Sequence, residues 1–303
     1  MFRIELLVDA RNELGEGPLW DVAEQRLYWI DSHGAMIQRV DARGEGLESW
    51  AVPEHIGSMC LRAAGGAVVA LRNGFHFFDF QTGRAAPIAD PEAPCRRTRL
   101  NDGKVDRRGR FVAGGMDYEE REPLACLWRL DPGLRATRLE EGIIVSNGPC
   151  WSPDGATFYF ADSFRRTIWS YKYDLATGDL LSRRVFANFE GHLRGYPDGA
   201  TVDSEGFVWS VEVYGGRLVR FAPDGTIDRL IGMPTDSITS LSFGGADLDI
   251  LYVTSMARPY QGRRRLERPA GAAIHRLKRK RDAHRCACGR QDHTGRGAAL
   301  GRR

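Results

Sequence analysis

The 303-residue sequence has little cysteine and no long apolar run. Its six cysteines are scattered along the chain except for the last pair, which is unlike the dense framework of a disulfide-stabilised protein. No apolar stretch approaches the roughly 20 residues that a transmembrane helix requires, and the N-terminus MFRIELLVDA lacks the long apolar core of a signal peptide. We therefore expect a cytoplasmic protein that does not contact a membrane.

The chain also lacks a basic surface in its main part. The chain has 43 Lys and Arg residues and 40 Asp and Glu residues. Residues 263–303 contain 14 of the basic and 3 of the acidic residues, which leaves 29 basic and 37 acidic residues in 1–262. An acidic body with scattered basic residues repels a phosphate backbone, which argues against nucleic-acid binding by the main domain.

Helical periodicity is nearly absent, and a repeat takes its place. GEGPLW at 15–20 and SNGPCW at 146–151 share Gly, Pro and Trp at the same offsets, and four further copies follow the same register. The anchor positions of the six copies are Glu16, Ile56, Asp102, Asn147, Asp198 and Thr239. Their spacings of 40, 46, 45, 51 and 41 residues match one four-stranded blade. The pattern predicts an all-β, six-bladed β-propeller spanning residues 1–277.

The residue at the anchor position varies between copies, and it is the residue that can build a site: it is polar in Glu16, Asp102, Asn147 and Asp198, apolar in Ile56, and small in the last copy, at Thr239 or Ser240. The innermost strands of the blades line the central channel, so the anchor side chains converge there. Glu16, Asn147 and Asp198, with Asp102 and its neighbour Asn101, supply only oxygen ligands, which suit a hard divalent cation. Asp-Gly and Asn-Gly are also common turn pairs, but Glu16 is not a turn former.

The phrases LGEGPLW, RLNDGKVDRRGRFVAGGM, SNGPCWS and YPDGATVDSEGFVW resemble the SMP-30/gluconolactonase/LRE family, in order and at blade spacing over residues 10–258. The resemblance implies a sugar lactonase with one divalent cation at the mouth of the channel, Ca²⁺ being favoured over Zn²⁺, Mn²⁺, Mg²⁺ or Fe²⁺. It implies the cation ligands Glu16, Asn147 and Asp198. It also implies the substrate-binding residues Arg99, Asn101 and Glu119, although the loop around Glu119 departs from the family pattern.

The resemblance further implies that Asp198 is the catalytic base. A cation that polarises the lactone carbonyl and a carboxylate that accepts the proton of the attacking water would together open the lactone. The expected product is the sugar acid of an aldonolactone, made by a monomer or weak dimer. Two alternatives stay open: a non-catalytic cation-binding or interaction propeller, and a propeller hydrolase of the esterase or phosphotriesterase type. No G-x-S-x-G elbow supports a serine hydrolase.

The C-terminus departs from the repeat. After residue 262 the sequence is rich in Arg, Gly and Ala, and AAIHRL is its one apolar segment. We favour a frameshift product over two alternatives, a basic tail that binds nucleic acid or an anionic surface and a metal knuckle of His284, Cys286, Cys288 and His293. Residues 278–303 are expected to be a disordered basic tail, and AAIHRL is expected to serve as a closing strand.

Overall fold

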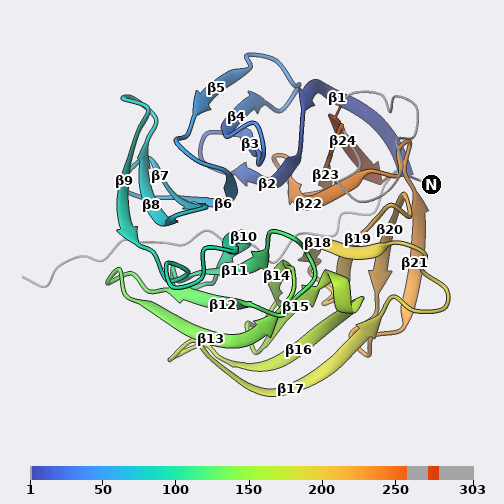
Figure 1. Cartoon of the computed structure of the whole chain (residues 1–303). Coiled ribbons are helices and arrows are strands. Elements are labelled where there is room, and N and C mark those ends of the chain that lie inside the picture. Colours follow the sequence, from blue (N-terminus) through green and yellow to red (C-terminus); the bar gives the residue numbers. More distant parts are fainter. Residues whose placement is uncertain (1, 258–271, 280–303) are drawn as a thin grey trace, which may run out of the picture.

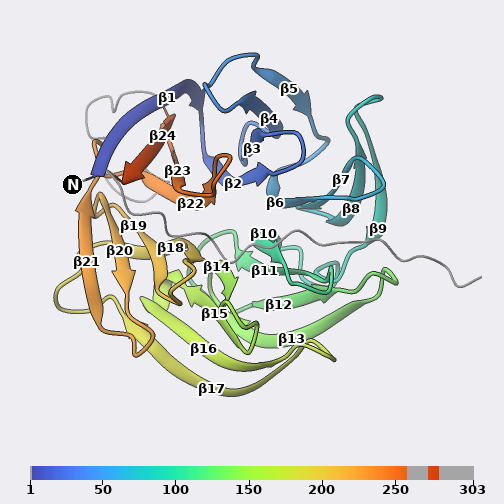
Figure 2. The same cartoon turned by 180° about the vertical axis from the view of Figure 1, so that it is seen from behind.

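The computed structural model describes residues 2–257 and 272–279, which form six four-stranded antiparallel sheets around one axis (Figure 1). Figure 2 shows the opposite face of the same ring. The expected all-β, six-bladed propeller is confirmed. In these two ranges the one helical element is a 3₁₀ turn, η1 (Ser163–Arg165), and none is long and apolar enough to cross a membrane.

Each blade presents its innermost strand to the axis and its outermost strand to the rim. The innermost strands are β2 (Gly15–Asp21), β6 (Ile56–Leu61), β10 (Thr98–Val105), β14 (Ser146–Trp151), β18 (Tyr196–Val202) and β22 (Ile238–Gly244). The second strands are β3 (Arg26–Asp31), β7 (Ala67–Leu71), β11 (Phe111–Asp117), β15 (Thr157–Asp162), β19 (Val208–Val213) and β23 (Ile250–Ser255).

The third and fourth strands complete the blades towards the rim. The third strands are β4 (Met36–Asp41), β8 (Gly74–Asp79), β12 (Ala125–Leu130), β16 (Thr167–Asp174), β20 (Arg217–Phe221) and β24 (Ala272–Arg279). The outermost strands are β5 (Glu48–Ala51), β9 (Arg84–Ala89), β13 (Ala136–Ile143), β17 (Asp179–Asn188), β21 (Ile227–Gly232) and β1 (Phe2–Asn12).

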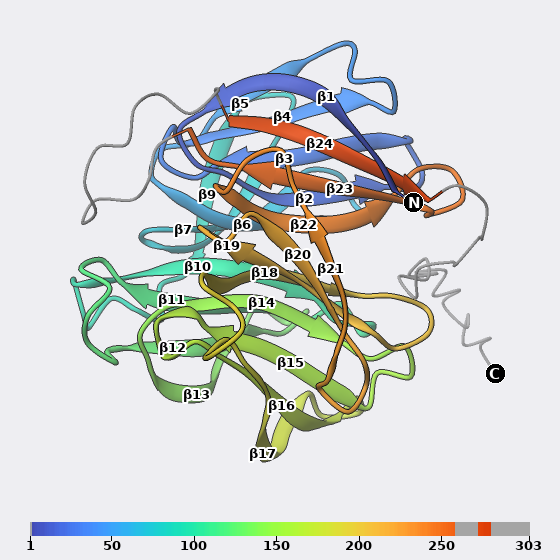
Figure 3. The ribbon, with the colours of Figure 1, turned by 90° about the vertical axis from the view of Figure 1, so that its right-hand side faces the viewer.

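The ring is closed by strands from both ends of the chain. β24 lies between β23 and β1 in the last blade, and β1 pairs with β24 from Phe2–Arg279 to Asn12–Ala272 (Figure 3). The strand expected in AAIHRL is therefore present, and it continues to Arg279. The sequence pattern did not reveal the role of β1, which supplies the fourth strand of the blade that the repeat leaves incomplete. The expected tail beyond residue 279 lies outside the described residues.

The described core consists of six apolar clusters, and each cluster lies between two neighbouring blades. The cluster that joins the last blade to the first contains Trp20, Trp29, Tyr252 and Ile274. Trp20 stacks on Tyr252 with ring centroids 5.5 Å apart. The shared Trp of the repeat is therefore a packing residue between blades, as its recurrence indicates.

All six innermost strands change register against their second strand near the anchor position. The shift falls between Glu16 and Leu19 in the first blade and between Asn147 and Cys150 in the fourth. Equivalent shifts occur in the other four blades. A bulge of this kind turns side chains out of the regular alternation of a strand. It places the variable polar residues at one end of the channel.

Removal of β24 is expected to open the ring. A chain ending at Pro269 loses the buried Ile274 and Leu277 and leaves β1 unpaired, whereas a chain ending at Arg279 keeps the whole blade. We expect the first truncation to lower Tm by roughly 10 °C or more, since each of these aliphatic side chains contributes about 1.5–3 kcal/mol and each kcal/mol moves Tm by about 2–4 °C.

Thermal melts of both truncations and the full chain check this expectation. The chain ending at Arg279 should melt within roughly 2 °C of the full chain. A large loss of stability on removing only residues 280–303 would contradict a domain boundary after β24.

Candidate active site

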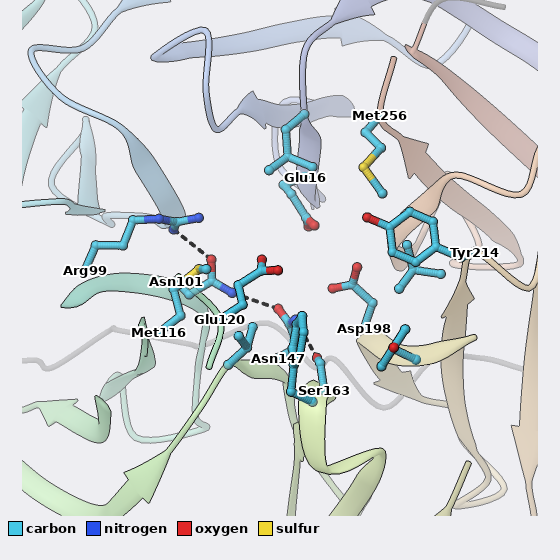
Figure 4. Close-up of a pocket in the computed structure, with 15 residues that line it drawn as sticks. Glu16, Arg99, Asn101, Met116, Glu120, Asn147, Ser163, Asp198, Tyr214 and Met256 are labelled. Atoms are coloured by element: carbon cyan, nitrogen blue, oxygen red, sulfur yellow. Dashed lines mark hydrogen bonds between the residues drawn. The ribbon is translucent and has the colours of Figure 1, made fainter. Parts of the chain in front are cut away.

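A pocket opens at the end of the channel where the innermost strands begin (Figure 4). Side chains from four of these strands line it: Glu16 from β2, Arg99 and Asn101 from β10, Asn147 from β14 and Asp198 from β18. Figure 4 shows that Glu16, Asn147 and Asp198 point towards the same part of this pocket. Five of the six site residues that the family resemblance implies thus line one pocket.

The sixth residue, Glu119, does not line the pocket. Its side chain is 60% exposed and lies near Arg97 and Arg121, at 3.9 and 3.8 Å. The adjacent Glu120 lines the pocket instead. The loop after β11 explains the difference of one residue, because Glu120 adopts a left-handed conformation (φ 56°) that an alignment by sequence does not reveal.

Asp117 holds this loop in place. Its carboxylate is fully buried and accepts hydrogen bonds from the backbone N–H groups of Arg121 and Glu122, at 3.2 and 3.0 Å. The chain reverses around this carboxylate, and the reversal points Glu120 into the pocket.

Asp102 also differs from its expected position in the ring. Asp102 is 4% exposed, and its carboxylate accepts a hydrogen bond from the backbone N–H of Gly148 at 2.8 Å. The pocket is lined by Asn101 rather than Asp102. Asp102 therefore acts as a buried tie between the third and fourth blades, and its charge lies beneath the site.

A directional chain of hydrogen bonds crosses three blades under the pocket. Arg99 Nη1 donates to Asn101 Oδ1 at 2.8 Å, and Asn101 Nδ2 donates to Asn147 Oδ1 at 3.0 Å. Asn147 Nδ2 then donates to Ser163 Oγ at 2.9 Å, and Ser163 donates to the carbonyl of Pro197 at 2.6 Å. Asn101 Nδ2 also donates to the Ser146 carbonyl at 3.0 Å. The amide of Asn101 is therefore committed to orienting its neighbours.

Gly148 allows the fourth and fifth blades to approach closely. A Cβ atom on this residue would lie 2.8 Å from both the carbonyl oxygen of Asp198 and the Cβ of Ala200. Its φ of 60° also belongs to the left-handed region that favours glycine. The shared Gly of the repeat thus keeps Asn147 and Asp198 near each other.

Burial and mutual repulsion raise the pKa values of the carboxyl groups in the site. The pKa of Glu16 is well above its usual value because of burial first and repulsion by Asp198 and Asp102 second. The pKa of Asp198 is also well above its usual value, because of burial and then repulsion by Asp102. Burial raises the pKa of Glu120 to about 7, although Arg99 opposes the shift. The site thus gathers carboxyl groups in a desolvated place, where each is harder to ionise than in water.

Three aromatic side chains also line the pocket. Phe164 stacks on Tyr196 with centroids 5.4 Å apart, and Tyr196 meets Tyr214 edge to face at 6.4 Å. Phe164 and Tyr214 are 40% and 39% exposed, so they form the open rim. The repeat gave no signal for these residues because they lie outside its anchor positions.

The donor set fits a hard divalent cation. Two carboxylates and one amide oxygen converge, and a cation would relieve the repulsion that raises the pKa values of Glu16 and Asp198. No three His, Cys, Asp or Glu side chains among the described residues form a metal site by themselves. Asn147 lines the same pocket and adds an amide oxygen to the two carboxylates.

The fold and the pocket define a six-bladed β-propeller with two carboxyl groups and a side-chain amide beside an arginine at one end of its channel. The chain belongs to the SMP-30/gluconolactonase/LRE-like family, whose model matches residues 14–257.

Named relatives share most of the chain. The 6-deoxy-6-sulfogluconolactonase of Pseudomonas putida is 36% identical over 252 residues, which cover 83% of this chain and 86% of the relative. The L-arabinolactonase of Azospirillum brasilense is 37% identical over 258 residues, which cover 82% and 83%. The solved structure of a luciferin-regenerating enzyme superposes with a TM-score of 0.85 at 26% identity and covers 94% of this chain and 97% of its own.

A methyl group on Gly148 is expected to disturb the site through the strand that carries Asp198. Gly148→Ala should cost about 1 kcal/mol or more for the left-handed backbone, with a further loss from crowding. Gly142→Ala is the matched control, because its φ is 74° and a Cβ there meets nothing within 4 Å. Urea unfolding of both variants should show the larger loss of stability for Gly148→Ala. Equal losses would mean that the contact between the two blades is not tight.

Proposed function

We propose that the chain hydrolyses a sugar lactone, of the aldonolactone class, to the corresponding sugar acid with the help of one divalent cation, Ca²⁺ being favoured. The observation that carries the proposal is the convergence of Glu16, Asn147 and Asp198 beside Arg99 in one pocket. The relatives named as sugar lactonases support the same chemistry.

Glu16, Asn147 and Asp198 would hold the cation through oxygen atoms. When bound, such a cation supplies Lewis-acid polarisation of the lactone carbonyl and stabilises the negative charge that develops there. The hydrogen bonds from Asn101 to Asn147 and from Asn147 to Ser163 keep the amide in one orientation. The residues beneath the pocket therefore hold the ligand set in place before substrate arrives.

Asp198 is the proposed general base. Its carboxylate would take a proton from the attacking water as the new C–O bond forms, and would return that proton to the ring oxygen as the lactone C–O bond breaks. Burial and repulsion by Asp102 raise the pKa of Asp198 in the cation-free protein. A bound cation would oppose this shift and favour the ionised carboxylate, which is the form that accepts a proton.

Substrate orientation is assigned to Arg99, Asn101 and Glu120. Arg99 is only 1% exposed, and its Nη1 donates to Asn101 Oδ1 and to the Leu100 carbonyl. Arg99 therefore contributes positive charge to the pocket and holds the side chain of Asn101 at the pocket wall. Glu120 takes the role expected for Glu119, because it is the carboxyl group that faces the pocket. A sugar hydroxyl can donate to this carboxylate.

Loss of the Asp198 carboxylate is expected to abolish lactone opening. Asp198→Asn should lower kcat by about 10²-fold or more, because it removes the proton acceptor. Titration of an aldonolactone panel with a pH indicator measures the rate.

A chelator should likewise remove the activity of the parent protein, and added Ca²⁺ should restore it. Activity that persists in excess chelator would refute the cation requirement, and binding of the cation without turnover of any lactone or ester would favour a non-catalytic propeller.

The adjacent acids Glu119 and Glu120 provide a matched pair. Glu120→Gln is expected to raise KM by about tenfold, because it weakens a charge-assisted hydrogen bond to a sugar hydroxyl. Glu119→Gln should leave KM and kcat within about twofold, since surface substitutions rarely have larger effects and this side chain is exposed. Steady-state kinetics on the best lactone compare them. The reverse result would restore the assignment of Glu119.

A further inference from the structure

The short turn after β15 places a buried hydroxyl between two of the proposed cation ligands. Ser163 is 4% exposed, and its Oγ accepts from Asn147 Nδ2 at 2.9 Å and donates to the Pro197 carbonyl at 2.6 Å. Pro197 immediately precedes Asp198. Figure 4 shows the hydrogen bond between Ser163 and Asn147 of the fourth blade. The bond to Pro197 connects the same hydroxyl to the strand that carries Asp198 in the fifth blade.

The turn itself is firmly anchored. The backbone N–H of Ser163 donates to the carbonyl of Val145 at 2.9 Å. The preceding Asp162 carboxylate accepts from the backbone N–H groups of Ile144 and Val145 at 3.2 and 3.3 Å. The hydroxyl of Ser163 is therefore held at a fixed height relative to the first residues of β14.

The chemistry of the two ends sets the direction of the whole chain of hydrogen bonds. Arg99 can only donate, so Asn101 presents its carbonyl to Arg99 and its N–H groups to Asn147. At the other end the Pro197 carbonyl can only accept, so the single hydroxyl proton of Ser163 points to it. The lone pairs of Ser163 then face Asn147. Asn147 must therefore present its NH₂ to Ser163, and its oxygen is left on the side of Asn101 and the pocket.

We propose that Ser163 is a positioning residue for the cation site: its hydroxyl prevents the Asn147 amide from rotating and couples Asn147 to the strand of Asp198. This inference rests on the proposed function only in taking Asn147 and Asp198 as cation ligands. Without the hydroxyl, Asn147 Nδ2 has lost its acceptor, and the amide can turn so that its nitrogen takes the place of its oxygen. Partners that orient a ligand in this way typically change metal affinity by about 10- to 100-fold when removed.

Ser146 offers a matched control. It precedes Asn147 on β14, it is fully buried, and its Oγ has no hydrogen-bond partner in the part of the chain that the structure describes. Ser146→Ala and Ser163→Ala delete the same atom at comparable burial, and only the second deletes a contact to a ligand. Ser163→Thr keeps the hydroxyl.

The test is isothermal titration of the full chain and the three variants with Ca²⁺ and with Mn²⁺, together with thermal melts without cation. We expect Ser163→Ala to raise the Kd for the cation by about tenfold or more. The Kd of Ser146→Ala should stay within about twofold of the parent value, and that of Ser163→Thr within about threefold. Saturating cation should restore most of the kcat of Ser163→Ala.

The possible results distinguish failure of the Ser163 positioning role from failure of the proposed lactonase function. A Kd for Ser163→Ala within twofold of the parent, or equal weakening by Ser163→Thr and Ser163→Ala, would overturn the positioning role. A parent chain that binds neither cation would refute the proposed ligand set, and the inference with it. Cation binding that weakens as expected in a protein that opens no lactone would uphold the inference and refute the reaction.

Discussion

Closure of the ring by β1 and β24 is the constraint on which the rest of the structure depends. The proposed ligands come from the first, fourth and fifth blades, and no single blade holds more than one of them. Their convergence requires each blade to keep its angle to its neighbours. The cluster around Trp20 and Tyr252 joins the last blade to the first and includes the buried Ile274, so β24 contributes to holding that angle. The geometry of the pocket is therefore a property of the complete ring.

The sequence was sufficient for the architecture because the repeat encodes it locally. The copies carry inner strands and turns in the same order, so the blade count and the anchor positions follow from spacing alone. Glu16, Asn147 and Asp198 were found in this way, and the structure brings all three into the pocket. The part played by β1 could not be found by the same means, because its partner is separated from it by most of the chain and FRIELLVDARN lacks the features of the repeat.

The finer features of the site depend on backbone conformation and hydrogen-bond direction, which spacing does not contain. Glu119 and Glu120 are the same amino acid in adjacent positions, and only the left-handed φ of Glu120 determines which one faces the pocket. Asp102 matched the expected register, yet the N–H of Gly148 draws its carboxylate beneath the site. Ser163 had no signal, because a serine after a strand is an ordinary turn residue until its two partners are seen.

The position of β1 has a consequence for how the chain folds. Phe2 pairs with Arg279, so this contact closes a loop of nearly the whole chain, and contacts of such separation form late. Until β24 arrives, β1 has an open edge on which backbone groups and the exposed Leu6 are available to other chains. The other five blades can assemble from neighbouring segments as each one is made. We therefore expect the slowest folding step, and most aggregation, to involve the pairing of β1 with β24 in the last blade. The pocket at the axis takes its final shape only when this pairing has closed the ring.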